Sequence, residues 1–196
     1  MRILGISGSL RRASFNTSLL RIAATRLPPG VELDLFDGLA DVPHYNQDDD
    51  TEAAPAGAVR LRGAIAAADG LLVATPEYNG TLPGALKNAI DWASRPLPDS
   101  VLKGKAVAVV GASAGRFGAV WAQAAARRSF GVAGADVLDR ELAVSEAHKT
   151  LGSDAGLGDS ALAAALEEIV AALASHIDPR TSLGGTAAPL GLVDRT

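Results

Sequence analysis

The 196-residue chain contains no cysteine. This absence excludes disulfides, thiolate nucleophiles, iron–sulfur clusters and zinc sites built on cysteine. The three histidines, His44, His148 and His176, are scattered singly and lack the spacing of metal ligands, so we expect surface or capping roles for them. Any redox chemistry must therefore be carried by an organic cofactor.

The chain also lacks an excess of positive charge and a long apolar run. Its formal net charge is −4 and no basic stripe is present, so the sequence gives no basis for binding nucleic acid. No apolar stretch approaches the ~20 residues of a membrane span. The N-terminus leads directly into an apolar run without the pattern of a signal peptide. We expect a cytoplasmic protein with no nucleic-acid or membrane partner.

Apolar runs alternate with helical patterns along the chain and predict an α/β fold. Five runs predict strands, at residues 3–6, 31–36, 70–74, 106–110 and 135–138. Helical spacing follows each of them, including residues 55–68, 82–93 and about 158–177. The third and fourth runs are continuously apolar, as in strands buried on both faces, whereas the outer runs are mixed. This pattern predicts a doubly wound parallel sheet of order 2-1-3-4-5 with helices on both faces. We expect one domain over residues 1–178 and a tail over 179–196.

In such a sheet a ligand binds beyond the carboxyl ends of the strands, where the strand order reverses. The loops after strands 1, 3 and 4, predicted at 8–16, 75–82 and 111–118, should therefore share one crevice. The first loop has hydroxyl and amide side chains and Arg11 or Arg12, but no P-loop lysine and no G-x-G-x-x-G pattern. This set suits a single phosphate monoester at a helix N-terminus. The alternative is purely structural, with Asn16 as the helix N-cap and glycines present only for the turn.

The other two loops have the properties of a site for a flat ligand. Pro76 and Pro83 stiffen the ends of the second loop, and Asn79-Gly80 predicts a turn. Held in this way, the backbone could pair with the polar edge of a planar heterocycle while Tyr78 packs beside the ring. In the third loop, small residues allow the backbone to approach a ligand closely. Arg116 could add charge there or cap the sheet edge.

Two motifs of the chain resemble the NAD(P)H-dependent FMN reductase family, which has the flavodoxin-like fold and includes quinone, chromate and azo-dye reductases. They read Gly8-Ser9-Leu10-Arg11-x-x-Ser14-x-Asn16 and Pro76-Glu77-Tyr78-Asn79-Gly80, the latter leading into Pro83-Gly84-Ala85-Leu86-Lys87-Asn88-Ala89-Ile90-Asp91-Trp92. The resemblance implies that three groups of residues bind FMN. The phosphate is held by Ser9, Arg11, Ser14, Asn16, Thr17 and Ser18, the isoalloxazine is lined by Pro76, Glu77, Tyr78, Asn79 and Gly80, and the far side is closed by Ser113, Gly115 and Arg116.

The resemblance further implies an NADPH- or NADH-dependent oxidoreductase. A hydride would pass to flavin N5 and then to a quinone, free flavin, an azo compound or chromate in a ping-pong reaction. It also implies a homodimer, with a tetramer left open because the family's bridging polar residues are not clearly matched around Trp121. The stretch 43–48 is similar to a loop that lies near the dimer interface in relatives.

Three alternatives remain open from the sequence. A flavodoxin would carry electrons on FMN without oxidising NAD(P)H itself, although flavodoxins tend to be more acidic than this chain. A response-regulator-like module would need acidic residues after the first strand, where Ser7 and Gly8 stand. A nucleotide-binding protein that never handles flavin would be colourless. The sequence does not favour a hydrolase triad, because the serines of the first loop have no nearby histidine.

Overall fold

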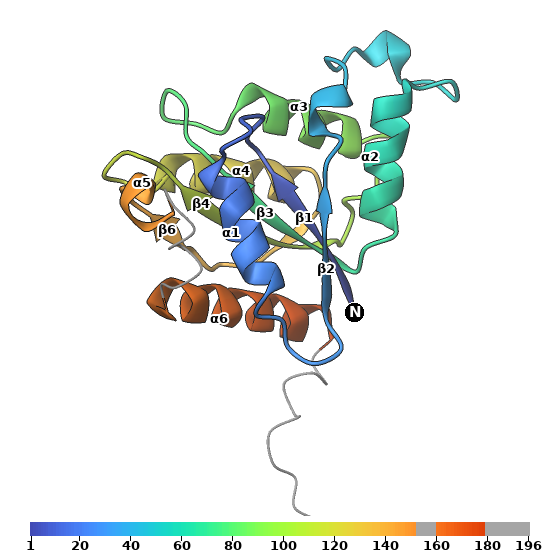
Figure 1. The fold of residues 1–196 in the computed structure, drawn as a ribbon. Coiled ribbons are helices and arrows are strands. Elements are labelled where there is room, and N and C mark those ends of the chain that lie inside the picture. The colour runs from blue at the N-terminus through green and yellow to red at the C-terminus, as the bar shows by residue number, and fades with distance from the viewer. Residues whose placement is uncertain (152–159, 179–196) are drawn as a thin grey trace, which may run out of the picture.

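A parallel sheet in the order β2-β1-β3-β4-β5 forms the centre of the computed structural model, which describes residues 1–151 and 160–178 (Figure 1). The strands are β1 (Arg2–Ser7), β2 (Glu32–Phe36), β3 (Gly70–Thr75), β4 (Ala106–Ala112), β5 (Asp136–Val137) and β6 (Ala143–Val144). The predicted strand order is confirmed, and it reverses between β1 and β3 as expected. The predicted tail at 179–196 lies outside the described residues.

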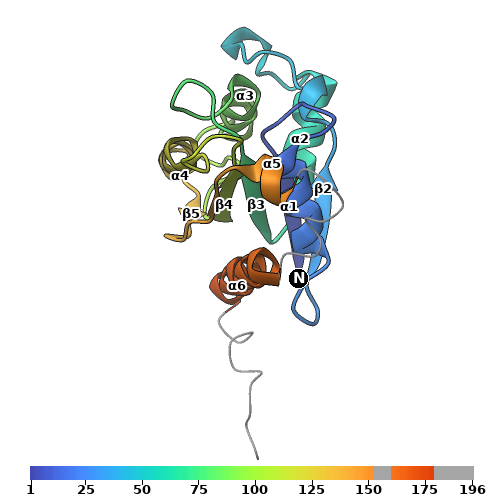
Figure 2. The same ribbon diagram turned by 60° about the vertical axis from the view of Figure 1, so that its left-hand side comes forward.

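Helices cover both faces of the sheet, as the turned view in Figure 2 also shows. They are α1 (Phe15–Ala24), α2 (Ala56–Ala66), α3 (Gly84–Ala93), α4 (Val120–Val132), the short α5 (Ala147–Thr150) and α6 (Ser160–Ile177), with 3-10 turns at Leu39–Asp41 and Gln47–Asp49. In β3, Leu72 and Ala74 pack toward α1 and α6, whereas Leu71 and Val73 pack toward α2, α3 and α4. This double burial explains why the strand is continuously apolar.

The edge beyond β4 differs from the prediction. A single strand was expected over 135–138, but two short strands share this position. β5 pairs with the start of β4, where Ala106 faces Asp136, and β6 pairs with its end, where Ala112 faces Val144. Two-residue strands are too short to show a periodicity, so β6 left no signal in the sequence. Because β4 extends to Ala112, the third loop begins at residue 113 and not at 111.

Helix α6 is the one helix among the described residues that is long and apolar enough to cross a membrane, judged by length and composition alone, with a mean hydropathy of 1.4 over 18 residues. This differs from the expectation that no stretch would approach such a length. Leu166, Val170 and Leu173 of this helix are fully buried in the core. Packing against α1, β3 and β4 therefore accounts for its apolar composition.

Candidate functional site

The loop between β1 and α1 places hydroxyl groups around the N-terminus of α1. The Ser14 side chain accepts a hydrogen bond from the Thr17 backbone N–H at 3.2 Å and is the N-cap of the helix. The alternative in which Asn16 is the cap is therefore wrong. The Thr17 hydroxyl donates to the Ser7 hydroxyl at 2.9 Å, and the Gly8 N–H donates to the Ala74 carbonyl at 2.8 Å. These bonds fix the loop against the ends of β1 and β3.

Asn16 joins the first loop to the third. Its amide Nδ2 donates to the Ala112 carbonyl at 3.0 Å, and its Oδ1 accepts from the Ala112 N–H at 2.9 Å. The pairing of β3 with β4 ends at Thr75 and Gly111, so β3 offers no hydrogen-bond partner to the backbone of Ala112. The Asn16 side chain takes that place. The side chain is 2% exposed. Asn16 thus holds α1 against the end of β4.

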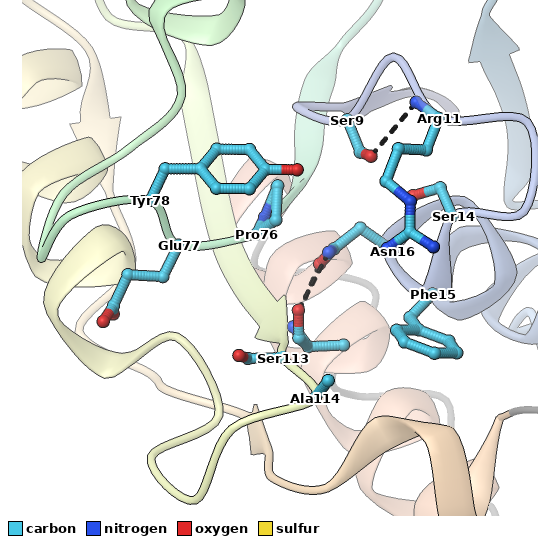
Figure 3. A pocket seen from close by; sticks show the side chains of 11 residues that line it. Ser9, Arg11, Ser14, Phe15, Asn16, Pro76, Glu77, Tyr78, Ser113 and Ala114 are labelled. Atoms are coloured by element: carbon cyan, nitrogen blue, oxygen red, sulfur yellow. Dashed lines mark hydrogen bonds between the residues drawn. The ribbon is translucent and has the colours of Figure 1, made fainter.

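A cavity lies beside this junction and is formed by all three predicted loops (Figure 3). It is open to solvent and spans about 490 Å³, including the space at its mouth. Of the predicted site residues, it brings together Ser9, Arg11, Ser14, Asn16, Pro76, Glu77, Tyr78 and Ser113. Phe15, Ala112 and Ala114 also line it and were not predicted. Phe15 was missed because an aromatic residue at the start of an amphipathic helix is usually interpreted as part of the hydrophobic core.

Six predicted residues do not line this cavity. They are Thr17, Ser18, Asn79, Gly80, Gly115 and Arg116. Thr17 and Ser18 bond within the protein, and the Ser18 hydroxyl donates to the Ser14 carbonyl at 3.2 Å. The other four are exposed on the two loops beyond the cavity wall.

Arg11 is the cation of the cavity. Its side chain is exposed at the mouth, and its guanidinium carbon lies 5.9 Å from the centre of the Phe15 ring. The backbone N–H of Arg11 donates to the Ser9 hydroxyl at 3.4 Å. Figure 3 shows the guanidinium beside Ser14 and Asn16. The positive charge and the first turn of α1 therefore favour an anion at the same place. Of the two predicted candidates, Arg11 lines the cavity and Arg12 does not.

The second loop is a tight hairpin. Asn79 and Gly80 have φ values of 53° and 74°, and Tyr78 and Thr81 exchange backbone hydrogen bonds at 3.1 and 3.2 Å. The predicted turn is confirmed, and its positive φ angles explain the Asn-Gly sequence. The turn holds the Tyr78 ring at the cavity with the side chain half exposed.

Glu77 points away from the centre of the cavity toward α4 (Figure 3). Its Oε2 accepts from the N–H groups of Trp121 and Ala122 at 3.1 and 3.2 Å. These N–H groups belong to the first turn of α4, so a carboxylate here both caps the helix and complements its dipole. Glu77 thereby couples the second loop to α4, a role that the sequence did not reveal because the partners are more than forty residues apart.

The third loop is fastened to β6 and α5 from behind. The Ser113 N–H donates to the Val144 carbonyl at 3.0 Å, and the Glu146 N–H donates to the Gly115 carbonyl at 3.0 Å. A hydrogen bond from Lys149 lowers the pKa of the Glu146 carboxyl. Gly118 has a φ of 57°, and a Cβ there would lie 2.6 Å from the Ala143 backbone, so only glycine fits this close approach.

The second motif also anchors the loop that follows β2. The Trp92 indole N–H and the Asn88 amide both donate to the Pro43 carbonyl at 2.8 Å. Asn88 accepts in turn from the Tyr45 N–H at 2.7 Å, and the Tyr45 ring meets Trp92 edge-on at 5.0 Å. The Arg62 guanidinium donates to Oδ1 of Asp50 at 2.6 Å and so holds the end of this loop. Residues 43–50 are therefore held rigidly, and His44 is exposed on them.

Comparisons with known proteins identify the family to which the sequence is similar. The sequence model of the NADPH-dependent FMN reductase family matches residues 1–149. An NAD(P)H-dependent FMN reductase from Pseudomonas aeruginosa is 50% identical over 123 residues, 63% of this chain and 65% of that protein. A 2-hydroxy-1,4-benzoquinone reductase from a Burkholderia species is 46% identical over 123 residues, 63% of this chain and 66% of that protein. The chain thus matches slightly less than two thirds of the length of these relatives.

A solved structure matches over a longer stretch. The flavoenzyme NAD(P)H:(acceptor) oxidoreductase FerB from Paracoccus denitrificans superposes with a TM-score of 0.81 at 34% identity, covering 91% of this chain and 97% of that one. The azoreductase AzrA, at 20% identity and a TM-score of 0.60, shares the fold alone. The predicted flavodoxin-like architecture is confirmed by the sheet order and by the superposition with FerB.

Proposed function

Because the chain belongs to the NADPH-dependent FMN reductase family, we propose that it is an FMN-dependent oxidoreductase that uses NADPH or NADH to reduce quinones or free flavin. The observation that carries this proposal is the meeting of three loops at one cavity, with a phosphate-type first loop at one end and Tyr78 at the other. The relatives named above support the class of reaction and of acceptor.

The residues present fit FMN. The hydroxyls of Ser9 and Ser14 and the first N–H groups of α1 are donors for a terminal phosphate, and Arg11 neutralises part of its charge. Pro76 and Tyr78 would line the ring system. When bound, FMN supplies the redox chemistry by accepting a hydride at N5 from the nicotinamide and delivering two electrons to the acceptor. The protein contributes binding and orientation of the rings.

We further propose ping-pong kinetics. One open cavity can hold the nicotinamide or the acceptor against a flat cofactor, but not both on the same face. NAD(P)⁺ should therefore leave before the quinone binds, and double-reciprocal plots should give parallel lines. Intersecting lines would contradict this order of events. Azo compounds and chromate are further candidate acceptors for the same assay.

The experiment that tests the function is a visible absorption spectrum before and after anaerobic addition of NADPH or NADH. A flavin reductase should be yellow and lose its absorbance near 450 nm within seconds, roughly the range of typical turnover. A flavodoxin-type carrier would be yellow but would keep its colour. A nucleotide-binding protein that does not use flavin would be colourless from the start, and either result would refute the proposal.

We also propose a homodimer in the cytoplasm, where NAD(P)H is available as reductant, with a tetramer still open. The indole of Trp92 is buried within the protomer, so this residue itself is not part of an interface. The rigid loop 43–50 and the exposed side chains of Leu97 and Val132 offer surface beside α3 and α4 instead. Light scattering at micromolar concentration measures the mass, and a fully active monomer would contradict the proposal.

A further inference from the structure

A second cavity lies on the other side of the β1–α1 loop, between α1 and the end of β2. It is also open to solvent and spans about 740 Å³, compared with about 490 Å³ for the cavity described above, both counted with the space at the mouth. Strand β2 is the edge strand next to β1 (Figure 1). Phe36 and Asp37, at the carboxyl end of β2, line the cavity, so it lies at the same carboxyl end of the sheet.

The lining of this cavity has an apolar part and a polar part. Leu20, Leu35 and Phe36 give it an apolar wall. Its charged side chains are two arginines, Arg11 and Arg21, and one carboxylate, Asp37. Such a wall suits the face of a planar nucleobase, a carboxylate suits the hydroxyl groups of a ribose, and an arginine suits a phosphate. These three requirements are met together by a nucleoside phosphate.

The two cavities share a boundary. Ser9 and Arg11 line both of them, so a phosphate held by the β1–α1 loop lies where the two cavities meet. A ligand with a single terminal phosphate ends at this boundary. A ligand in which this phosphate is joined through a second phosphate to a nucleoside would extend into the second cavity. We propose that this cavity holds the adenylate half of FAD, so that the chain binds FAD as well as FMN; the proposal rests on the proposed flavin site.

The position of Asp37 supports a ribose contact. Ile6 pairs with Phe36 in the parallel register, so Asp37 leaves β2 at the level where Ser7 ends β1. Dinucleotide-binding sheets of related topology use an acidic residue at this place to bind ribose hydroxyls. Arg60 holds this end of β2 in place, because it pairs with Oδ1 of Asp37 and lies 5.5 Å from the centre of the Phe36 ring.

The test fills the second cavity without touching the first. Ala40 lines only the second cavity and is exposed at its mouth, so Ala40→Trp should block it. Equilibrium dialysis of flavin-free protein then gives dissociation constants for FAD and FMN. We expect FAD affinity to fall by about tenfold or more because an overfilled site is strongly disfavoured, while FMN affinity stays within about twofold. Ala66→Trp, on the exposed end of α2 and away from both cavities, is the matched control.

A second variant removes the ribose contact. Asp37→Ala should lower FAD affinity by about tenfold, as expected for one hydrogen bond to a charged group, and leave FMN affinity unchanged. Its folding is checked by thermal denaturation, and its exposed position makes a large loss of stability unexpected.

Several results would overturn the proposal. They are an absence of FAD binding to a protein that binds FMN, an equal loss for both flavins in either variant, and no loss for FAD in both variants. Binding of neither flavin would instead refute the flavin site itself. An increase in the KM for NADPH in Ala40→Trp, with FAD affinity unchanged, would assign the cavity to the adenylate of the reductant and would also overturn the proposal.

Discussion

Replacing Asn16 by alanine should destabilise the protein more than it affects the phosphate site directly. The side chain makes two hydrogen bonds to the Ala112 backbone, at 3.0 and 2.9 Å, and both are buried. In Asn16→Ala these bonds are lost and the N–H and carbonyl of Ala112 are left without a partner inside the protein. Because each of these two buried groups costs about 1–3 kcal/mol, the free energy of unfolding should fall by about 2–6 kcal/mol.

The assay is thermal and urea denaturation of the flavin-free protein, so that ligand binding does not contribute to stability. For a chain of this size, the expected loss corresponds to a decrease in Tm of about 4–24 °C. Ser18→Ala is the matched control, because its hydroxyl donates only to the Ser14 carbonyl one turn away and its loss should cost well under about 1 kcal/mol. A variant with unchanged Tm but much weaker FMN binding would refute this reasoning and make Asn16 a direct phosphate ligand.

Three further predictions concern single side chains. Arg11→Ala should weaken FMN binding by about ten- to a hundredfold, as expected for a charge-assisted hydrogen bond, and leave the affinity for riboflavin unchanged in the same dialysis assay; an equal loss for both would contradict this role. Glu77→Ala should lower the free energy of unfolding by about 1 kcal/mol through loss of the α4 cap, and Glu77→Gln should recover most of it because the amide oxygen can accept the same two bonds. Desolvation lowers the pKa of Lys105 below its ordinary value of 10.5. At pH values between this lowered pKa and 10.5, the folded state binds fewer protons than the unfolded state. The free energy of unfolding should therefore rise as the pH rises toward 10.5. Urea denaturation at several pH values should show that Lys105→Met removes this rise. If the free energy of unfolding of the variant changes with pH as in the unmodified protein, the prediction is wrong.

The sequence predicted those features that depend on local patterns. The apolar runs of β3 and β4 gave the centre of the sheet, because burial on both faces leaves no polar alternation. The Asn79-Gly80 turn was predicted because few residues tolerate two consecutive positive φ angles. Ser9, Arg11 and Tyr78 were placed at one crevice because parallel strands bring their carboxyl ends to one edge.

The features that were missed depend on contacts between distant parts of the chain. Asn16 and Ala112 are 96 residues apart, and no local pattern distinguishes an asparagine that binds a phosphate from one that completes a sheet. Glu77 and α4 are similarly remote, at 44 residues to Trp121. The split between β5 and β6 was missed because a strand of two residues owes its conformation to its partner β4 and not to its own sequence.

That split edge has a consequence for how molecules of this protein can associate. An unbroken edge strand presents a regular row of free N–H and carbonyl groups, on which another chain can add a strand and begin aggregation. Here β5 and β6 meet β4 at separate ends, and the segment between them leaves the plane of pairing, with Glu141 tied to Arg127 at 2.9 Å. No continuous template for strand addition is therefore offered along this side of the described sheet, so an ordered complex on this side would have to form through helices and loops.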